Sequence, residues 1–140
     1  DALVEKINLK YAAGSWKPII ILQGPLPPNT LAALRGMADL CIVSSLHDGM
    51  NLVAKEFIAS QPDNDGVLLL SSSAGAAREL EDALLINPLA VDQFAASIKQ
   101  ALDMPEWERR RRMRRKRGIV RRSNIYKWAA DIFSQLAQLS

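Results

Sequence analysis

The sequence predicts an α/β domain in which helices cover a parallel sheet, and two observations support that fold class. Four short apolar runs, each followed by turn-forming residues, alternate with segments whose apolar residues recur at helical spacing. The runs show no polar alternation, which is typical of strands buried on both faces of a parallel sheet. Strands and helices that alternate at short spacing form such a sheet with the simplest connections.

The four apolar runs are predicted to be strands because each is short, continuous and ended by a turn signal: residues 19–22, 40–44, 67–70 and 83–86. Gly24 and the prolines after it end the first run, and Gly49 lies in the turn after the second. Small residues at 71–77 follow the third run, and Asn87-Pro88 ends the fourth.

The remaining periodic segments are predicted to be helices because their apolar residues recur every three or four positions: residues 3–9, 31–38, 52–60, 78–82, 91–102 and 125–136. Asn29 or Thr30 is expected to cap the second of them. We therefore expect a single domain over 1–140, with C-terminal helices at about 91–139.

The composition is that of a globular domain. With 140 residues, 49% of them hydrophobic and 24% charged, the chain can form a core. It has no apolar run of membrane-spanning length and no signal-peptide order at its start. The single cysteine, Cys41, lies in an apolar run, so we expect a small buried side chain and a cytoplasmic protein. Since the chain does not begin with Met, it resembles an excised or processed piece.

Charge is divided unevenly along the chain. Residues 1–108 contain seven Lys/Arg and fourteen Asp/Glu, whereas 109–122 contain ten Lys/Arg and no acid. The basic run lacks interleaved aromatic residues and zinc-ligand spacing, and its arginines surround a helix instead of forming one stripe. We therefore interpret it as a solvated connecting helix, or one that faces an acidic surface, in preference to a nucleic-acid interface.

Three loops are predicted at the carboxyl ends of the strands, at residues 23–28, 44–50 and 71–77. Open parallel sheets bind ligands at that end, so the three loops could face one crevice. The last of them, made of small residues, fits either a closely approaching ligand or a tight connection. His47 is interpreted as a solvated side chain, and Lys55 as solvated or ion-paired.

The middle loop, residues 44–50, has the strongest indication of ligand binding. Gly49 suits a conformation or a close approach that a side chain would block. The N–H groups of Asn51, Leu52 and Val53 would be free donors at a helix start, where the helix dipole favours a phosphate.

Two carboxylates flank that helix start. Asp48 is itself anionic and is better suited to accept hydrogen bonds from sugar hydroxyls, and Glu56 could hold two vicinal hydroxyls, as on a ribose. The same spacing also fits an Asp cap with a Glu in the first turn, which needs no ligand. The residues alone leave both interpretations open.

The segment 48–56, D-G-M-N-L-V-A-K-E, resembles the trehalose-6-phosphate synthase family without a change. Flanking segments agree along nearly the whole chain, among them Trp16 to Ile19, 66–71, Ala74 to Ala77 and Asn87-Pro88. These are retaining glycosyltransferases of the GT-B type, and the resemblance covers only their C-terminal, donor-binding half. It implies a Rossmann-like three-layer domain with a parallel sheet.

The resemblance also implies a role for each matching residue. The donor would be a nucleoside diphosphate glucose such as UDP-glucose, bound without metal, cofactor or enzyme nucleophile. The implied contacts are Asp48, Gly49, Met50 and Asn51 for the donor sugar, Leu52 and Val53 for the phosphates, Glu56 for the ribose and Leu26 for the base.

The chain departs from the family at Ser45-Leu46-His47, where Pro-Leu-Arg is usual, and at Ser73, where an aromatic residue is usual. The base and the acceptor therefore stay open: a sugar phosphate, or glycerol 3-phosphate as in glucosylglycerol-phosphate synthase. The family's N-terminal acceptor domain and its cationic phosphate clamp are absent from these 140 residues, so we expect the chain alone to be inactive. A non-catalytic nucleotide-sugar-binding module is the alternative, and a homo-oligomer is compatible with either.

Overall fold

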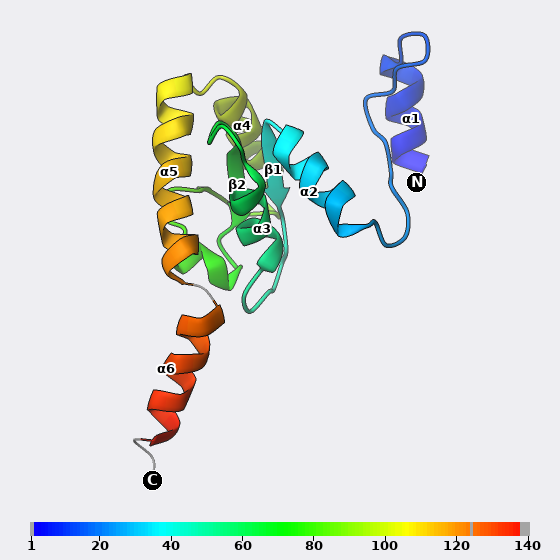
Figure 1. The fold of residues 1–140 in the computed structure, drawn as a ribbon. Coiled ribbons are helices and arrows are strands. Elements are labelled where there is room, and N and C mark those ends of the chain that lie inside the picture. The colour runs from blue at the N-terminus through cyan, green and yellow to red at the C-terminus, as the bar shows by residue number, and fades with distance from the viewer. Residues whose placement is uncertain (1, 124, 138–140) are drawn as a thin grey trace.

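The computed structural model describes residues 2–123 and 125–137 (Figure 1). Its central sheet has three parallel strands in the order β1-β2-β3. They are β1 (Leu40–Val43), β2 (Val67–Ser71) and β3 (Leu84–Ile86). Leu40 pairs with Val67, and Leu69 pairs with Leu84. The predicted α/β class with a parallel sheet is confirmed.

The helices and one 3₁₀ turn follow the chain in order: α1 (Ala2–Tyr11), α2 (Pro28–Met37), α3 (Leu52–Ser60), η1 (Gly75–Arg78), α4 (Val91–Leu102), α5 (Glu106–Arg122) and α6 (Ile125–Ala137). Helices α3 and α5 cover one face of the sheet, and α4 covers the other. α6 extends away from the sheet (Figure 1), and its Tyr126, Phe133 and Leu136 are exposed.

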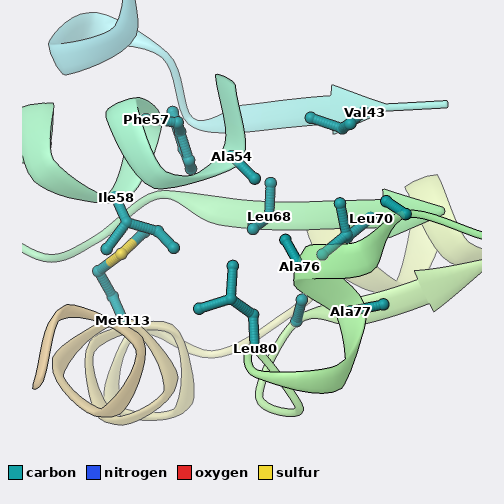
Figure 2. Packing of buried hydrophobic residues seen from close by; sticks show 12 residues of the cluster. Val43, Ala54, Phe57, Ile58, Leu68, Leu70, Ala76, Ala77, Leu80 and Met113 are labelled. Carbon is teal, nitrogen blue, oxygen red and sulfur yellow. The ribbon is translucent and has the colours of Figure 1, made fainter. Parts of the chain in front are cut away.

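Strand β2 carries the core because all five of its residues are buried. Leu68 and Leu70 face α3 and α5, where they pack with Phe57 and Met113 (Figure 2). The alternate residues of β2 pack on the other face, in the cluster that α4 supplies. Successive side chains of a strand point to opposite faces, so a continuous apolar run in the centre of a sheet fills two cores at once.

The predicted strand at 19–22 is wrong. These residues pair with no strand of the described chain, and Ile20 is 74% exposed. The side-chain amide of Asn8 on α1 bonds both the N–H and the carbonyl oxygen of Ile19, at 3.0 and 2.9 Å. Figure 1 shows α1 and the segment after it lying apart from the sheet. A β-branched run forms a strand only where a neighbouring strand supplies backbone hydrogen-bond partners, and these residues have no such neighbour within the part of the chain that the structure describes.

Two smaller predictions are also wrong. Neither Asn29 nor Thr30 caps α2, because that helix already begins at Pro28, whose fixed φ suits a first helical position. The short helix expected at 78–82 is replaced by the 3₁₀ turn η1. The other strands and helices lie within a few residues of their predicted bounds. None of the helices in the described part of the chain is long and apolar enough to cross a membrane.

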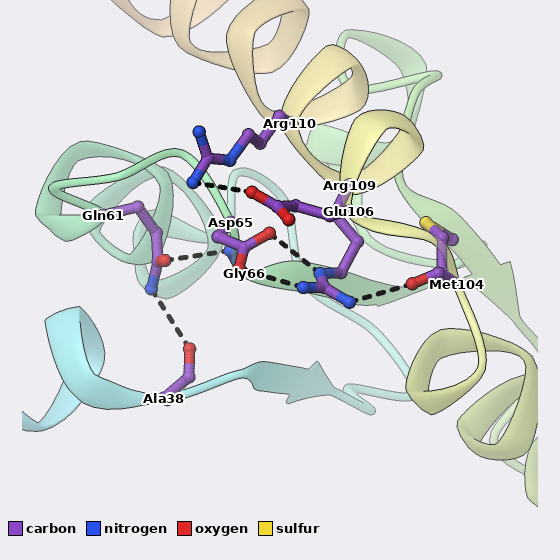
Figure 3. Close-up of polar contacts among 8 residues, drawn as sticks. All are labelled: Ala38, Gln61, Asp65, Gly66, Met104, Glu106, Arg109 and Arg110. Carbon is purple, nitrogen blue, oxygen red and sulfur yellow. Dashed lines mark hydrogen bonds and ion pairs between the residues drawn. The ribbon is translucent and has the colours of Figure 1, made fainter.

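Arginines of α5 bind groups of the domain itself. Arg109 donates to both carboxylate oxygens of Asp65, at 2.9 and 3.0 Å, and to the carbonyl oxygen of Met104 at 2.9 Å (Figure 3). Arg115 lies 3.6 Å from Asp82. The expectation that this helix faces an acidic surface is thus confirmed for Arg109 and Arg115. The hydrogen-bonded ion pair with Arg109 holds the pKa of Asp65 below its ordinary value.

Gln61, 3% exposed, joins the starts of two strands. Its amide nitrogen donates to the carbonyl oxygens of Arg35 and Ala38, at 2.6 and 3.3 Å, and its oxygen accepts from the N–H of Gly66 at 3.0 Å (Figure 3). Ala38 comes just before β1, and Gly66 comes just before β2. One side chain therefore satisfies backbone groups at the entrance to both strands.

Replacing Gln61 by Ala should lower the free energy of unfolding by about 2–4 kcal/mol, because buried backbone groups lose their partners. Urea denaturation measures the change. Gln100→Ala, at an exposed position on α4, is the matched control. An effect of Gln61→Ala no larger than that of the control would contradict the role assigned to Gln61.

α5 also buries a lysine. Lys116 is 1% exposed, and desolvation, together with repulsion from Arg112, lowers its pKa to about 8. The unfolded chain keeps the ordinary lysine pKa of 10.5. Between these two values the unfolded state binds a proton that the folded state releases, so this lysine costs stability below pH 8 and progressively less as the pH rises.

Lys116→Met should therefore raise the free energy of unfolding at pH 7 by roughly 1–3 kcal/mol. The advantage over the wild type should shrink as the pH rises from about 8 to 10.5, in urea denaturations repeated across that range. Lys6→Met, on the exposed side of α1, is the control. A stability difference that does not change with pH would show that Lys116 is not a titrating buried group.

Candidate functional site

The loop between β1 and α3 is organised by the carboxylate of Asp48. Its Oδ1 accepts hydrogen bonds from the N–H groups of Met50 and Asn51, at 3.1 and 2.9 Å, and its Oδ2 accepts from the side-chain amide of Asn51 at 2.9 Å. The bond from the Asn51 side chain, followed by the two backbone bonds, holds the pKa of the Asp48 carboxyl below its ordinary value. A carboxylate has about four acceptor positions, so one position on Oδ2 stays open for a ligand.

Asn51 turns the chain into α3. Its φ of 58° lies in the left-handed region, which asparagine tolerates better than most residues. Its side-chain oxygen accepts from the N–H of Ala54 at 2.9 Å, which makes Asn51, and not Asp48, the cap of the helix. The prediction that the Asn51 N–H is free is wrong, because Asp48 accepts its hydrogen bond.

The amides of Leu52 and Val53 differ from that of Asn51. They are the first two of α3, and none of the described residues accepts a hydrogen bond from either. Both side chains are exposed. These two donors remain available to a ligand at a helix start, as the sequence predicts.

The special conformation expected at Gly49 is wrong, and the close approach within the protein is made by a different glycine. Gly49 does not have a left-handed φ, and a Cβ built on it would meet nothing within 4 Å. The close approach occurs at Gly75, in the loop after β2, where a Cβ would overlap the carbonyl oxygen of Gly49 and lie 2.8 Å from its carbonyl carbon. Room for the close approach of two backbone segments is required at Gly75, which lies beyond α3 and β2 in the sequence.

The loops after β1 and β2 are joined to each other. The N–H of Gly75 donates to the carbonyl oxygen of Asp48 at 2.8 Å, and Asp48 and Ala74 form an isolated parallel bridge. Lys55 of α3 and Glu79 form a second link, with Nζ 2.9 Å from Oε2. The predicted convergence of 44–50 and 71–77 is thereby confirmed, and Lys55 is ion-paired.

The third loop is not part of this group. With no strand at 19–22, residues 23–28 do not follow a strand end, and the segment that holds Leu26 lies to the side of the sheet with α1 (Figure 1). Leu26 is half-buried just before α2. The structure does not bring it to the Asp48 loop.

An open hollow of about 350 Å³ lies beside the start of α3. Its lining comes from the end of β1 and from the loop after it: Ile42, Val43, Ser44, Ser45, Asn51 and Val53. Two adjacent serines therefore line the same hollow as Val53, which carries one of the two helix-start amides. Ser44 and Ser45 are expected in this loop, but no pattern in the sequence indicates that they line a hollow.

Glu56 faces a different neighbour. Its carboxylate lies 2.7 Å from the guanidinium of Arg35 on α2, and its side chain is 51% exposed. The carboxylate of Asp48 bonds to Met50 and Asn51 in its own loop, so the two acids do not share a partner. Met50 and His47 are exposed in the loop.

Replacing Asn51 by Ala should lower the free energy of unfolding by about 1–2 kcal/mol, because Ala neither caps α3 nor favours a left-handed φ. Asn51→Gly should cost less, since glycine adopts that φ freely. Thermal or urea denaturation of the two variants makes the comparison. Equal losses in both variants would mean that the backbone conformation at Asn51 contributes nothing.

Known proteins resemble this chain in sequence and in structure over nearly its whole length. Glycosyltransferase family 20 matches residues 1–138. The bifunctional trehalose-6-phosphate synthase/phosphatase of Thermoproteus tenax is 43% identical over 136 residues, which are 97% of this chain and 19% of the relative. The glucosylglycerol-phosphate synthase of Picosynechococcus is 40% identical over 135 residues, which are 96% of this chain and 27% of the relative.

Two solved structures have the same fold. An alpha,alpha-trehalose-phosphate synthase (UDP-forming) from Burkholderia xenovorans, in complex with glucose-6-phosphate, superposes with a TM-score of 0.91 at 40% identity, over 97% of this chain and 30% of that one. An E. coli structure bound with UDP-2-fluoro glucose superposes with a TM-score of 0.90 at 39% identity. The match covers 96% of this chain and 30% of that one. The chain thus spans less than a third of the length of each of these four proteins.

The resemblance that the D-G-M-N-L-V-A-K-E segment indicates is confirmed: this chain belongs to glycosyltransferase family 20.

Proposed function

We propose that this chain is the nucleotide-sugar-binding part of a retaining glucosyltransferase. The whole protein would transfer glucose from a nucleoside diphosphate to a sugar phosphate. One observation carries the proposal: the two unpaired amides of Leu52 and Val53 open α3 beside a loop that Asp48 holds in place. A diphosphate is the ligand for which such a helix start is suited.

The diphosphate would lie on the Leu52 and Val53 amides, over the hollow that Val53 borders. The glucose would then lie against the loop after β1, where Asp48 has one acceptor position left. Gly49, Met50 and Asn51, which follow Asp48 in that turn, would contact the sugar as well. Asp48 would orient the sugar by hydrogen bonding and would not attack it.

Glu56 would hold the ribose, which requires its carboxylate to share Arg35 with the two hydroxyls or to exchange it for them. Leu26 would border the base only if the segment before α2 moved toward the loop. The roles of the sugar and phosphate residues therefore have more structural support than that of Leu26.

The acceptor would be held by a further domain of the whole protein. The relatives include trehalose-6-phosphate synthases and glucosylglycerol-phosphate synthases at nearly equal identity, so a glycerol phosphate is the second candidate. A binding module without transferase activity is the alternative function. We expect the 140-residue chain to bind a donor without transferring its sugar.

Calorimetric titration of the 140-residue chain with UDP-, GDP- and ADP-glucose tests donor binding. At least one of them should bind, and the corresponding nucleoside diphosphate should bind more weakly. Asp48→Ala should reduce the preference for the sugar nucleotide by about tenfold, the effect of removing one charged hydrogen bond. A chain shown by circular dichroism to be folded that binds none of the three would refute the proposal.

Glu56→Gln tests the ribose contact. The variant should bind the nucleoside diphosphate less tightly, and its affinity for the 2′,3′-dideoxy analogue should match that of the wild type. Glu81→Gln, at an exposed position remote from α3 in sequence, is the control. Equal weakening for the two ligands would reject the assignment of Glu56 to the ribose.

A further inference from the structure

We infer that Gly75, in the loop after β2, is a positioning residue for the donor sugar. Because Gly75 has no Cβ, the Gly49 carbonyl can lie against its Cα. This contact sets the position of the Asp48–Asn51 turn, and with it the position of the groups that would bind the sugar. The inference rests on the proposed function, and adds a residue that does not itself contact the donor.

The contact between the two loops leaves no room for a side chain at this position. A Cβ on Gly75 would overlap the carbonyl oxygen of Gly49, lie 2.8 Å from the carbonyl carbon and lie 3.5 Å from the Met50 nitrogen. These are backbone atoms, which cannot rotate away as the end of a side chain can. Since Gly75 has no left-handed φ, glycine is required here for space and not for conformation.

The loop that carries Gly75 is the fixed partner of this contact. Its neighbours Ala74, Ala76 and Ala77 are buried in the same core cluster as Phe57 of α3 and Met113 of α5. Figure 2 shows Ala76 and Ala77 in this cluster. The ion pair between Lys55 and Glu79 ties the same segment to α3. A group added at Gly75 would therefore displace the exposed Gly49–Met50 backbone and not the segment behind Gly75.

The phosphate end of the site would stay in place. Leu52 and Val53 are the first residues of α3, whose Ala54, Phe57 and Ile58 are fully buried. Asn51, which caps α3, is also buried. Gly75 should consequently affect the sugar part of a bound donor and leave the diphosphate part unchanged.

Gly75→Ala tests whether Gly75 affects the sugar part of the donor alone. Calorimetry compares the binding of a nucleoside diphosphate with that of its glucose derivative. We expect the affinity for the nucleoside diphosphate to stay within about twofold of the wild type, and that for the glucose derivative to fall about tenfold or more, as when a hydrogen bond to a charged group is lost. Gly118→Ala on α5, where a Cβ makes ordinary contact with the Arg122 side chain, is the matched glycine control.

A second variant decides the matter if Gly75→Ala does not fold. Glu79→Gln weakens the tie to Lys55 without adding volume, and should lower the affinity for the glucose derivative alone, by about two- to threefold. Lys99→Gln, which breaks an exposed ion pair on α4, is its control. An equal loss for both ligands, or no loss for the glucose derivative, would overturn the inference. Failure of the wild type to bind any donor would overturn the proposed function as well, so the two failures are distinguishable.

Discussion

The burial of β2 on both faces is the constraint on which the rest of the structure depends. Its five residues are all buried, so helices must cover both sides of the sheet, and β1 and β3 must flank it. The same parallel arrangement brings the ends of β1 and β2 to one edge. Asp48 and Gly75 can meet there only because their strands run side by side in register, from Leu40 with Val67 to Val43 with Leu70.

The site that results is made of backbone more than of side chains. Asp48 and Asn51 use most of their hydrogen-bonding capacity on each other and on the loop. What remains for a ligand is the pair of amides at the start of α3, one acceptor position on Asp48 and the serine hydroxyls of the hollow. Such a set of groups is suited to holding a diphosphate and a sugar.

Local signals predicted the elements well. The apolar run at 67–70 and the helical spacing at 52–60 both formed the expected structure, because burial and periodicity are properties of the segment itself. The run at 19–22 looked equally strong and failed, since a strand also needs a neighbour, which no local pattern specifies. The same dependence on distant neighbours explains why the sequence indicated Gly49 instead of Gly75 as the glycine in close contact. Gly49 stands in the turn, but the steric conflict belongs to Gly75, whose partner is distant in sequence. The spacing of Asp48 and Glu56 likewise could not show that Glu56 pairs with Arg35, which is distant in sequence.

The most direct test of the central claim is to follow the backbone amides of the 140-residue chain by nuclear magnetic resonance during titration with UDP-glucose. The largest shifts should occur at Leu52 and Val53, with smaller shifts across 48–51, because a diphosphate would accept hydrogen bonds from the two unpaired amides at the start of α3. Shifts confined to the arginine helix α5, with none at Leu52 or Val53, would contradict it.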